Sequence, residues 1–144
     1  MSPPPAPDAS GAPATNGHDH TAAGAFGARV RRLAARARRE REAFVEPTDP
    51  PDPERALVYA RDGVGPAVAV YVEARTREEW VEFSPGEFDL LHRALHDWLR
   101  LYAACYGVRV DPDATVRKAA ELLLATHSAV DVARLLTGVP GRDE

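Results

Sequence analysis

The chain has 144 residues and a formal net charge of −4, and five of its 13 prolines fall within residues 1–13. This length suits one domain with appendages, of which we expect about 90 to 100 residues to be ordered. The single cysteine, Cys105, excludes an intramolecular disulfide, and no apolar run reaches the length of a membrane span. Because the N-terminus also lacks a signal-peptide pattern, we expect a cytoplasmic protein with no membrane insertion.

The charge is unevenly distributed along the sequence. Residues 26–45 hold seven Arg and two Glu, a balance of +5, so the rest of the chain carries −9. Seventeen Arg against one Lys, Lys118, is typical of codon usage in a high-GC genome.

Residues 1–24 are Pro, Ala, Gly and small polar residues, and we expect a disordered tail because such a segment buries too little apolar surface. Apolar residues then recur at three- and four-residue intervals, interrupted at Glu40: Phe26, Val30, Leu33, Ala37 and Phe44. This spacing predicts a basic amphipathic helix over residues 25–46. The Pro-rich segment 47–54 predicts a stiff linker, so we expect this helix to be separate from the rest.

A two-residue period marks residues 55–83. The segments "RALVYAR", "AVAVYVEA" and "EEWVEF" predict the three strands of an antiparallel meander, with a turn at "DGVGP". Val68, Val70 and Val72 would lie on one face of this sheet.

The next segment has the clearest helix signals. Ser84, Pro85 and Glu87 form a capping-box pattern, and Gly107 suits the left-handed position after a helix. A continuous apolar stripe follows from Phe88 to Cys105, which predicts one long helix over about 85–106 that packs on the sheet.

Two short helices are expected at the C-terminal end, one after Asp111-Pro112 and one capped by Ser128 with Asp131. The predicted fold class is therefore α+β. Residues 55–140 would form a small domain of a three-stranded meander, one long helix and two short helices.

The stretch "WVEFSPGEFDLL" resembles strand-to-helix junctions in two families. These are the winged-helix output domains of response regulators and the single-strand-binding transcriptional coactivators, and both resemblances imply a sheet and nucleic-acid binding. The match departs from the first family in the length of the helix and from the second in the acidic residues of the expected strands. Helix capping alone would select the same residues.

The stretch "AVDVARLLTGVP" over residues 129–140 resembles the first helix and turn of the helix-turn-helix in lactose-repressor-type regulators. Only four residues follow it, where that motif places the recognition helix that enters the major groove. The alternative is a helix that packs on its neighbour.

The basic helix is the candidate contact surface. Arg29, Arg32, Arg36 and Arg39 are the candidate contacts for an anionic partner. Contact with a protein partner, docking on the acidic body of its own or another copy, contact with nucleic acid, and a merely solvated helix all stay open.

His92 and His96 stand four residues apart with Asp89 one turn before, a spacing that suits a metal site. No third or fourth ligand is placed nearby by the sequence, so we predict no metal and no cofactor. No nucleophile elbow, phosphate loop or carboxylate pair is found either, so we predict no catalytic residues and no enzyme activity.

Residues 78–140 as a whole resemble a small uncharacterised family of high-GC prokaryotes, with haloarchaea as one candidate source. The leading prediction is a small non-enzymatic interaction or regulatory protein. The alternative is a nucleic-acid-associated regulator that uses the Arg-rich helix or a degenerate helix-turn-helix.

Overall fold

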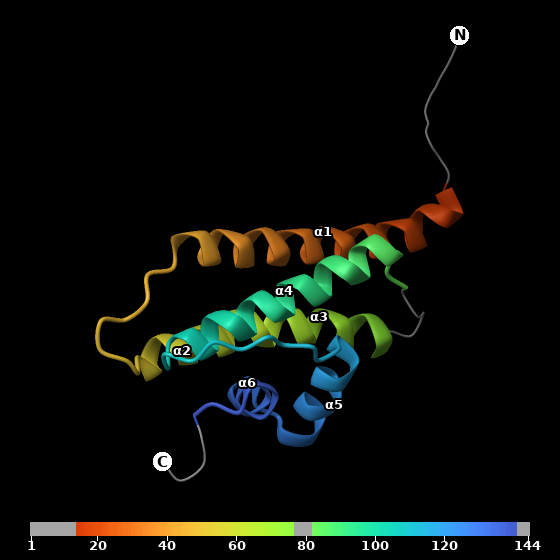
Figure 1. Ribbon diagram of the computed structural model, residues 1–144. Coiled ribbons are helices and arrows are strands. Elements are labelled where there is room, and N and C mark those ends of the chain that lie inside the picture. The colour runs from red at the N-terminus through yellow and green to blue at the C-terminus, as the bar shows by residue number, and fades with distance from the viewer. Residues whose placement is uncertain (1–13, 77–81, 141–144) are drawn as a thin grey trace.

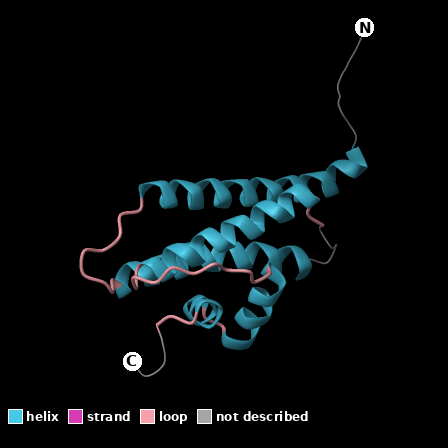
Figure 2. Cartoon of the chain, in the orientation of Figure 1, coloured by secondary structure: helices cyan, strands magenta, loops and turns pink. Residues whose placement is uncertain are grey.

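The computed structural model describes residues 14–76 and 82–140, and every regular element within these ranges is helical (Figure 1 and Figure 2). The elements are α1 (Ala14–Ala43), α2 (Pro53–Tyr59), the π-helical turn η1 (Ala60–Val64), α3 (Gly65–Thr76), α4 (Pro85–Ala104), α5 (Val116–Thr126) and α6 (Ala129–Thr137). The prediction of an α+β fold is therefore wrong. Part of the third predicted strand, residues 78–81, lies outside the described residues. The first two predicted strands belong to one helical rod, and the sheet implied by the winged-helix and coactivator resemblances is not found in the described ranges.

The rod α2–η1–α3 forms because its sequence also satisfies the helical period. Small and apolar residues recur three or four positions apart and become the buried side of the rod: Ala56, Tyr59, Ala60, Val64, Ala67, Val68, Tyr71 and Ala74. An apolar-rich run fits both periods, so the alternation of valines could not decide between strand and helix. Packing against α4 buries the three- and four-residue pattern, and the helix results.

The predicted turn at residues 62–66 is instead the π-helical turn and the start of α3. Pro66 has no N–H to give to the Asp62 carbonyl one turn earlier, which would break a regular α-helix here. That carbonyl instead accepts a hydrogen bond from Arg36 Nη1 at 3.3 Å. Gly63 lies against the indole of Trp98, where an added Cβ would stand 2.2 Å from Cδ2. The turn therefore lets the backbone approach this ring closely.

The prediction of a separate basic helix is also wrong, because α1 is part of the bundle. Phe26, Val30 and Ala37 are buried, so the apolar stripe faces the core as its spacing predicts. The helix begins at Ala14, inside the segment expected to be disordered, while residues 1–13 lie outside the described residues. The Pro-rich segment is tied down as well, since the Asp52 N–H donates to the Cys105 carbonyl at 2.7 Å.

The long helix α4 and its capping box are confirmed. Ser84 Oγ accepts from the Glu87 N–H at 3.1 Å, and Glu87 Oε1 accepts from the Ser84 N–H at 3.0 Å. In Figure 1, α4 lies in the middle of the bundle and runs in the same direction as α1, while α2–η1–α3 runs the opposite way. The sequence places large side chains along α4, which fill the core: Leu91, Leu95, Trp98, Leu99 and Tyr102.

The two short C-terminal helices are confirmed, although α5 begins later than predicted, at Val116 with Thr115 as its cap. Residues 108–115 therefore form an extended segment that returns along α4. His96 Nε2 donates to the Ala114 carbonyl at 2.7 Å and fastens this segment. Tyr102 Oη donates to the Val139 carbonyl at 2.8 Å and fastens the chain after α6. In the described ranges, no helix combines the length and apolar character that a bilayer crossing requires.

Candidate functional site: the arginines around α1

The docking of α1 divides its arginines among three directions. Seven Arg lie between Phe26 and Val45. Arg29 and Arg36 face α3 and η1, Arg31, Arg38 and Arg41 face α4, and Arg32 and Arg39 lie on the outer ridge. The environment of each set decides whether its charge is available to a partner.

The arginines that face α3 are held by the fold. Arg29 Nη1 lies 2.7 Å from Glu73 Oε1, and the hydrogen bond from Arg29 lowers the pKa of the Glu73 carboxyl. Arg36 bonds the Asp62 carbonyl, and its guanidinium carbon lies 5.5 Å from the centre of the Trp98 ring. Two of the four candidate contacts therefore fasten α1 to the bundle.

The other two candidate contacts, Arg32 and Arg39, are exposed on the ridge of α1. Neither forms an ion pair with another described residue. The structure thus separates the four residues into two that hold the fold and two that face solvent.

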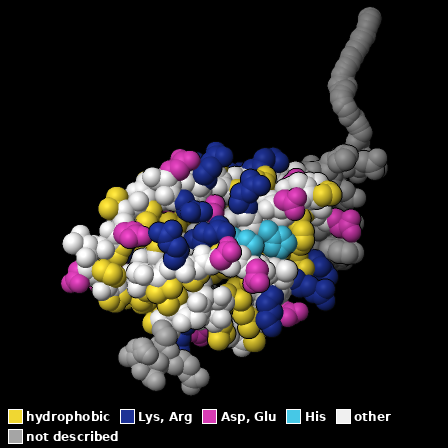
Figure 3. Space-filling model, in the orientation of Figure 1, with side chains coloured by type: hydrophobic (Ala, Val, Ile, Leu, Met, Phe, Trp, Pro, Cys, Tyr) yellow, Lys and Arg dark blue, Asp and Glu magenta, His cyan; other side chains and the backbone are white. Residues whose placement is uncertain are grey.

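A groove between α1 and α4 gathers further arginines, and we call it the Arg groove. It has a volume of about 200 Å³ and is lined by Arg31, Ala34, Ala35, Arg38, Leu90, Arg93 and Asp97. Figure 3 shows Lys and Arg side chains gathered over α1 and α4 on this face, next to the His side chains. The Arg groove combines three guanidinium groups with three apolar side chains.

Asp97 closes one end of the Arg groove and is the buried carboxylate of this face, with 8% of its surface exposed. Its Oδ1 accepts from Arg41 Nη1 at 2.9 Å and from Arg100 Nη1 at 3.3 Å. A buried carboxylate requires such partners, and here two arginines from two helices supply them.

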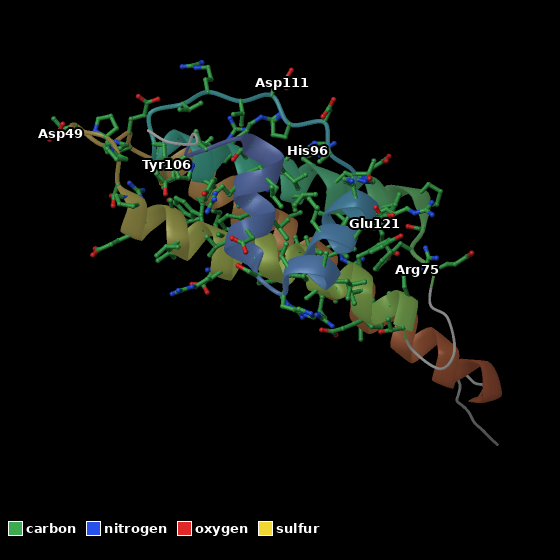
Figure 4. The ribbon with its side chains drawn as sticks, turned by 90° about the horizontal axis from the view of Figure 1, so that it is seen from below. Asp49, Arg75, His96, Tyr106, Asp111 and Glu121 are labelled. Carbon is green, nitrogen blue, oxygen red and sulfur yellow. The ribbon has the colours of Figure 1, made fainter. Side chains whose placement is uncertain are left out.

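A second hollow lies beyond Asp97, at the C-terminal ends of α1 and α4, and we call it the end pocket. It has a volume of about 380 Å³. Its lining includes Arg41, Arg100 and Arg109, with Glu46 among the other side chains. The segment that carries Arg109 also carries Asp111, which points away from the bundle in Figure 4.

The histidines of α4 are used differently from each other. His96 donates to the Ala114 carbonyl, while His92 makes an edge-to-face contact with Phe88, with ring centres 4.6 Å apart. Burial, with a smaller effect from His96, lowers the pKa of His92, whose Nε2 is buried with no hydrogen-bond partner. In the part of the chain that the structure describes, no three potential metal ligands lie together.

Cys105 is buried at the end of α4, and burial raises the pKa of its thiol to about 11. A thiol with so high a pKa carries very little thiolate at neutral pH, so it is a poor nucleophile. Cys105 therefore acts as a core residue.

Sequence reasoning missed Arg93, Arg100, Arg109 and Asp97. A signal for two of them was present, because Arg31 and Arg38 on α1 and Arg93 and Arg100 on α4 share a seven-residue spacing. Residues seven apart lie on one helix face, so each helix carries an Arg row. The sequence does not indicate that the Arg row of α1 and the Arg row of α4 face each other.

The comparisons with known proteins agree with the extent of this bundle. Neither the curated proteins nor the solved structures gave a match. Residues 24–141 match a domain of unknown function, DUF8055, and this range includes most of α1 together with all later helices. The chain therefore belongs to the DUF8055 family.

Proposed function

We propose that this protein is a non-enzymatic interaction module of the cytoplasm that binds an acidic segment of a protein partner in the Arg groove. The observation that carries the proposal is the set of three arginines that line this groove, of which Arg38 and Arg93 are exposed and form no ion pair with another described residue. The third, Arg31, stands 3.8 Å from Glu87, at the long end of an ion-pair distance.

Guanidinium groups on two facing helices suit carboxylates, because each can donate two parallel hydrogen bonds to one carboxylate. The same lining also contains apolar residues that can contact apolar side chains of the peptide, namely Ala34, Ala35 and Leu90. An acidic segment with interspersed leucines would match both parts of this lining.

A protein partner is favoured over nucleic acid by the acidic residues at the ends of the groove. Glu87 lies next to Arg31 and Asp97 lies next to Arg41. A nucleic-acid backbone carries charge at every nucleotide and would meet these carboxylates, while a peptide can place apolar residues there. A non-enzymatic role is supported by the buried position of Cys105, which removes a nucleophile from the surface.

Nucleic-acid binding is the second candidate, and the outer ridge of α1 favours it. Arg32 and Arg39 are exposed there, two turns apart. A regulator of this kind would use the ridge more than the groove.

Fluorescence anisotropy with matched variants tests the two candidates. The probes are a labelled Glu- and Leu-containing peptide and a labelled oligonucleotide, each at two salt concentrations. We expect Arg38→Glu with Arg93→Glu to abolish peptide binding, and Arg32→Glu with Arg39→Glu, which makes the same charge change, to reduce it less than about three-fold. Preference for the oligonucleotide, with a steep salt dependence and loss in the ridge variant, would favour the second candidate. If both variants weakened peptide binding equally, or if the peptide did not bind at all, the proposal that the Arg groove binds an acidic segment would be wrong.

A further inference from the structure

The end pocket has the composition of a site for an organic anion. Its lining includes the charged side chains of Arg41, Arg100 and Arg109 together with the half-buried apolar residues Val108 and Val110. Small-molecule sites commonly join apolar walls to a few polar groups that fix orientation. A volume of about 380 Å³ exceeds what a bare inorganic anion needs, so there is room for an organic group as well.

The end of a helix normally offers unpaired carbonyls, which would repel an anion. Here the last carbonyls of α4 are occupied within the chain. Ala103 accepts from the Tyr106 and Val108 N–H groups, Ala104 accepts from Gly107, and Cys105 accepts from Asp52, at distances of 2.7 to 3.1 Å. The arginine side chains are therefore the main polar groups that this helix end presents to the pocket.

Asp97 holds two of the three arginines in place. Arg41 and Arg100 both bond to its Oδ1, each through Nη1, which leaves further N–H groups on each guanidinium free of Asp97. The second bond of Arg100, from Nη2 to Asp111 at 3.5 Å, is weak because Asp111 is 98% exposed. One buried carboxylate fixes two cations, so the pair keeps a net positive charge.

The third arginine is brought to the pocket by the turn after α4. Gly107 has a φ of 76°, a conformation that other residues adopt rarely, and it reverses the chain into the 108–115 segment. The bond between His96 and the Ala114 carbonyl holds the far end of that segment. Arg109, which is exposed, then joins the lining from the side opposite to α1.

We propose that the end pocket binds a small organic phosphate ester. Three guanidinium groups from three segments of the chain can donate to three oxygens of one phosphate, while Val108 and Val110 contact the organic group. A phosphate monoester carries about −1.5 to −2 charge at pH 7, against −1 for a carboxylate, so it balances more of the positive charge of these three arginines. The pocket is separated from the Arg groove by Asp97, so this site stands or falls independently of peptide binding.

Isothermal titration with phenyl phosphate tests the proposal, with benzoate and inorganic phosphate as comparison ligands. We expect saturable one-to-one binding of phenyl phosphate that is tighter than binding of either comparison ligand. Arg109→Gln should weaken it about ten-fold, which corresponds to about 1.4 kcal/mol for one charge-assisted contact. Arg117→Gln is the matched control, because Arg117 is an exposed arginine on α5 outside the pocket and should leave the affinity unchanged.

A second variant is expected to bind phenyl phosphate more tightly, a result that a misfolded protein could not give. Glu46 is the acidic side chain in the lining, so Glu46→Gln should tighten phenyl phosphate binding by a few-fold. No saturable binding below about 10 mM would overturn the proposal. Equal weakening in the Arg109 and Arg117 variants, or benzoate binding as tightly as phenyl phosphate, would overturn it as well.

Discussion

The two sides of α1 carry the same residue type and use it in opposite ways. On the side of α3, Arg29 and Arg36 meet the Glu73 carboxylate and the Asp62 carbonyl. On the side of α4, Arg31 and Arg38 face Arg93 across the Arg groove. The difference lies in the facing residues, because α3 and η1 offer acceptors to Arg29 and Arg36, whereas α4 brings the cation Arg93 to the Arg groove.

This contrast shows which of the arginine charges remain unneutralised after folding. Arg29 and Arg36 meet acceptors of the chain and hold α1 in place, whereas Arg38 and Arg93 form no ion pair with another described residue and stay available to an outside anion. Asp97 marks the boundary, since this one carboxylate serves two arginines and leaves net positive charge on both of its sides. Arg29 and Arg36 should therefore contribute to holding α1 in the bundle, while Arg38 and Arg93 should contribute to binding.

The largest effect is expected where η1 meets the core. Gly63→Ala would place a Cβ 2.2 Å from Cδ2 of Trp98, whose ring is 1% exposed and cannot move aside. Overpacking of this kind should lower the free energy of unfolding by about 3 kcal/mol. Urea denaturation measures it. The control is Gly86→Ala in the first turn of α4, where nothing lies within 4 Å, and it should be neutral or slightly stabilising. Equal destabilisation by the two variants would contradict the close contact of η1 with Trp98.

Asp97→Asn should have the next largest effect and is the corresponding test on the side of α4. The amide cannot balance the charges of Arg41 and Arg100, so we expect a loss of about 2 kcal/mol in urea denaturation. Asp89→Asn changes an exposed carboxylate on the same helix and should cost less than about 0.5 kcal/mol. If the two variants cost the same, Asp97 would not be the carboxylate that fixes these arginines.

The two regions also differ in how far their sequence predicts them. The capping box of Ser84 and Glu87 uses residues within one turn, so α4 could be placed from the sequence alone. The rod α2–η1–α3 could not, because its valines fit two periods and its Gly63 and Pro66 usually indicate a turn. Tertiary packing of the buried side of this rod, including Gly63 against Trp98, favours the helix.

The sequence allowed us to predict a cationic helix, but not which of its arginines remain available to a partner. The surplus of arginine on α1 correctly indicated a cationic helix, but the choice of Arg29 and Arg36 as contacts requires knowing what faces them. The facing residues are 26 and 44 positions away in sequence, a separation that no helical period describes. The Arg groove depends in the same way on Arg93, which a single-helix analysis leaves out.

A smaller effect on stability depends on pH and comes from His92, which is not one of the groups that pair with the arginines of α1. His92 lines neither the Arg groove nor the end pocket, and its pKa is lowered by burial and by His96. In the unfolded chain, His92 binds a proton once the pH falls below the ordinary histidine pKa of about 6.5. In the folded chain, His92 binds a proton only at a lower pH. Stability from this group is complete above that value and falls as the pH drops below it, by at most about 1.4 kcal/mol per pH unit. Urea midpoints between pH 7 and pH 5 should fall more steeply for the wild type than for His92→Gln, and parallel curves would contradict this assignment.

The smallest effect belongs to the ion pair that distinguishes the side of α3. Glu73 is 53% exposed, so solvent screens its attraction to Arg29 despite the 2.7 Å distance. A double-mutant cycle with Arg29→Ala and Glu73→Ala should give a coupling energy below about 1 kcal/mol, decreasing with added salt. The pKa of Glu73 gives the same pair a second measure, because removal of Arg29 removes the hydrogen bond that lowers it. An NMR titration should therefore show the Glu73 pKa rising in Arg29→Ala, and an unchanged pKa would mean that this arginine faces solvent like Arg32. The seam with α3 would then rest on apolar packing and on Arg36 alone, and Arg29 would join the cations available to a partner.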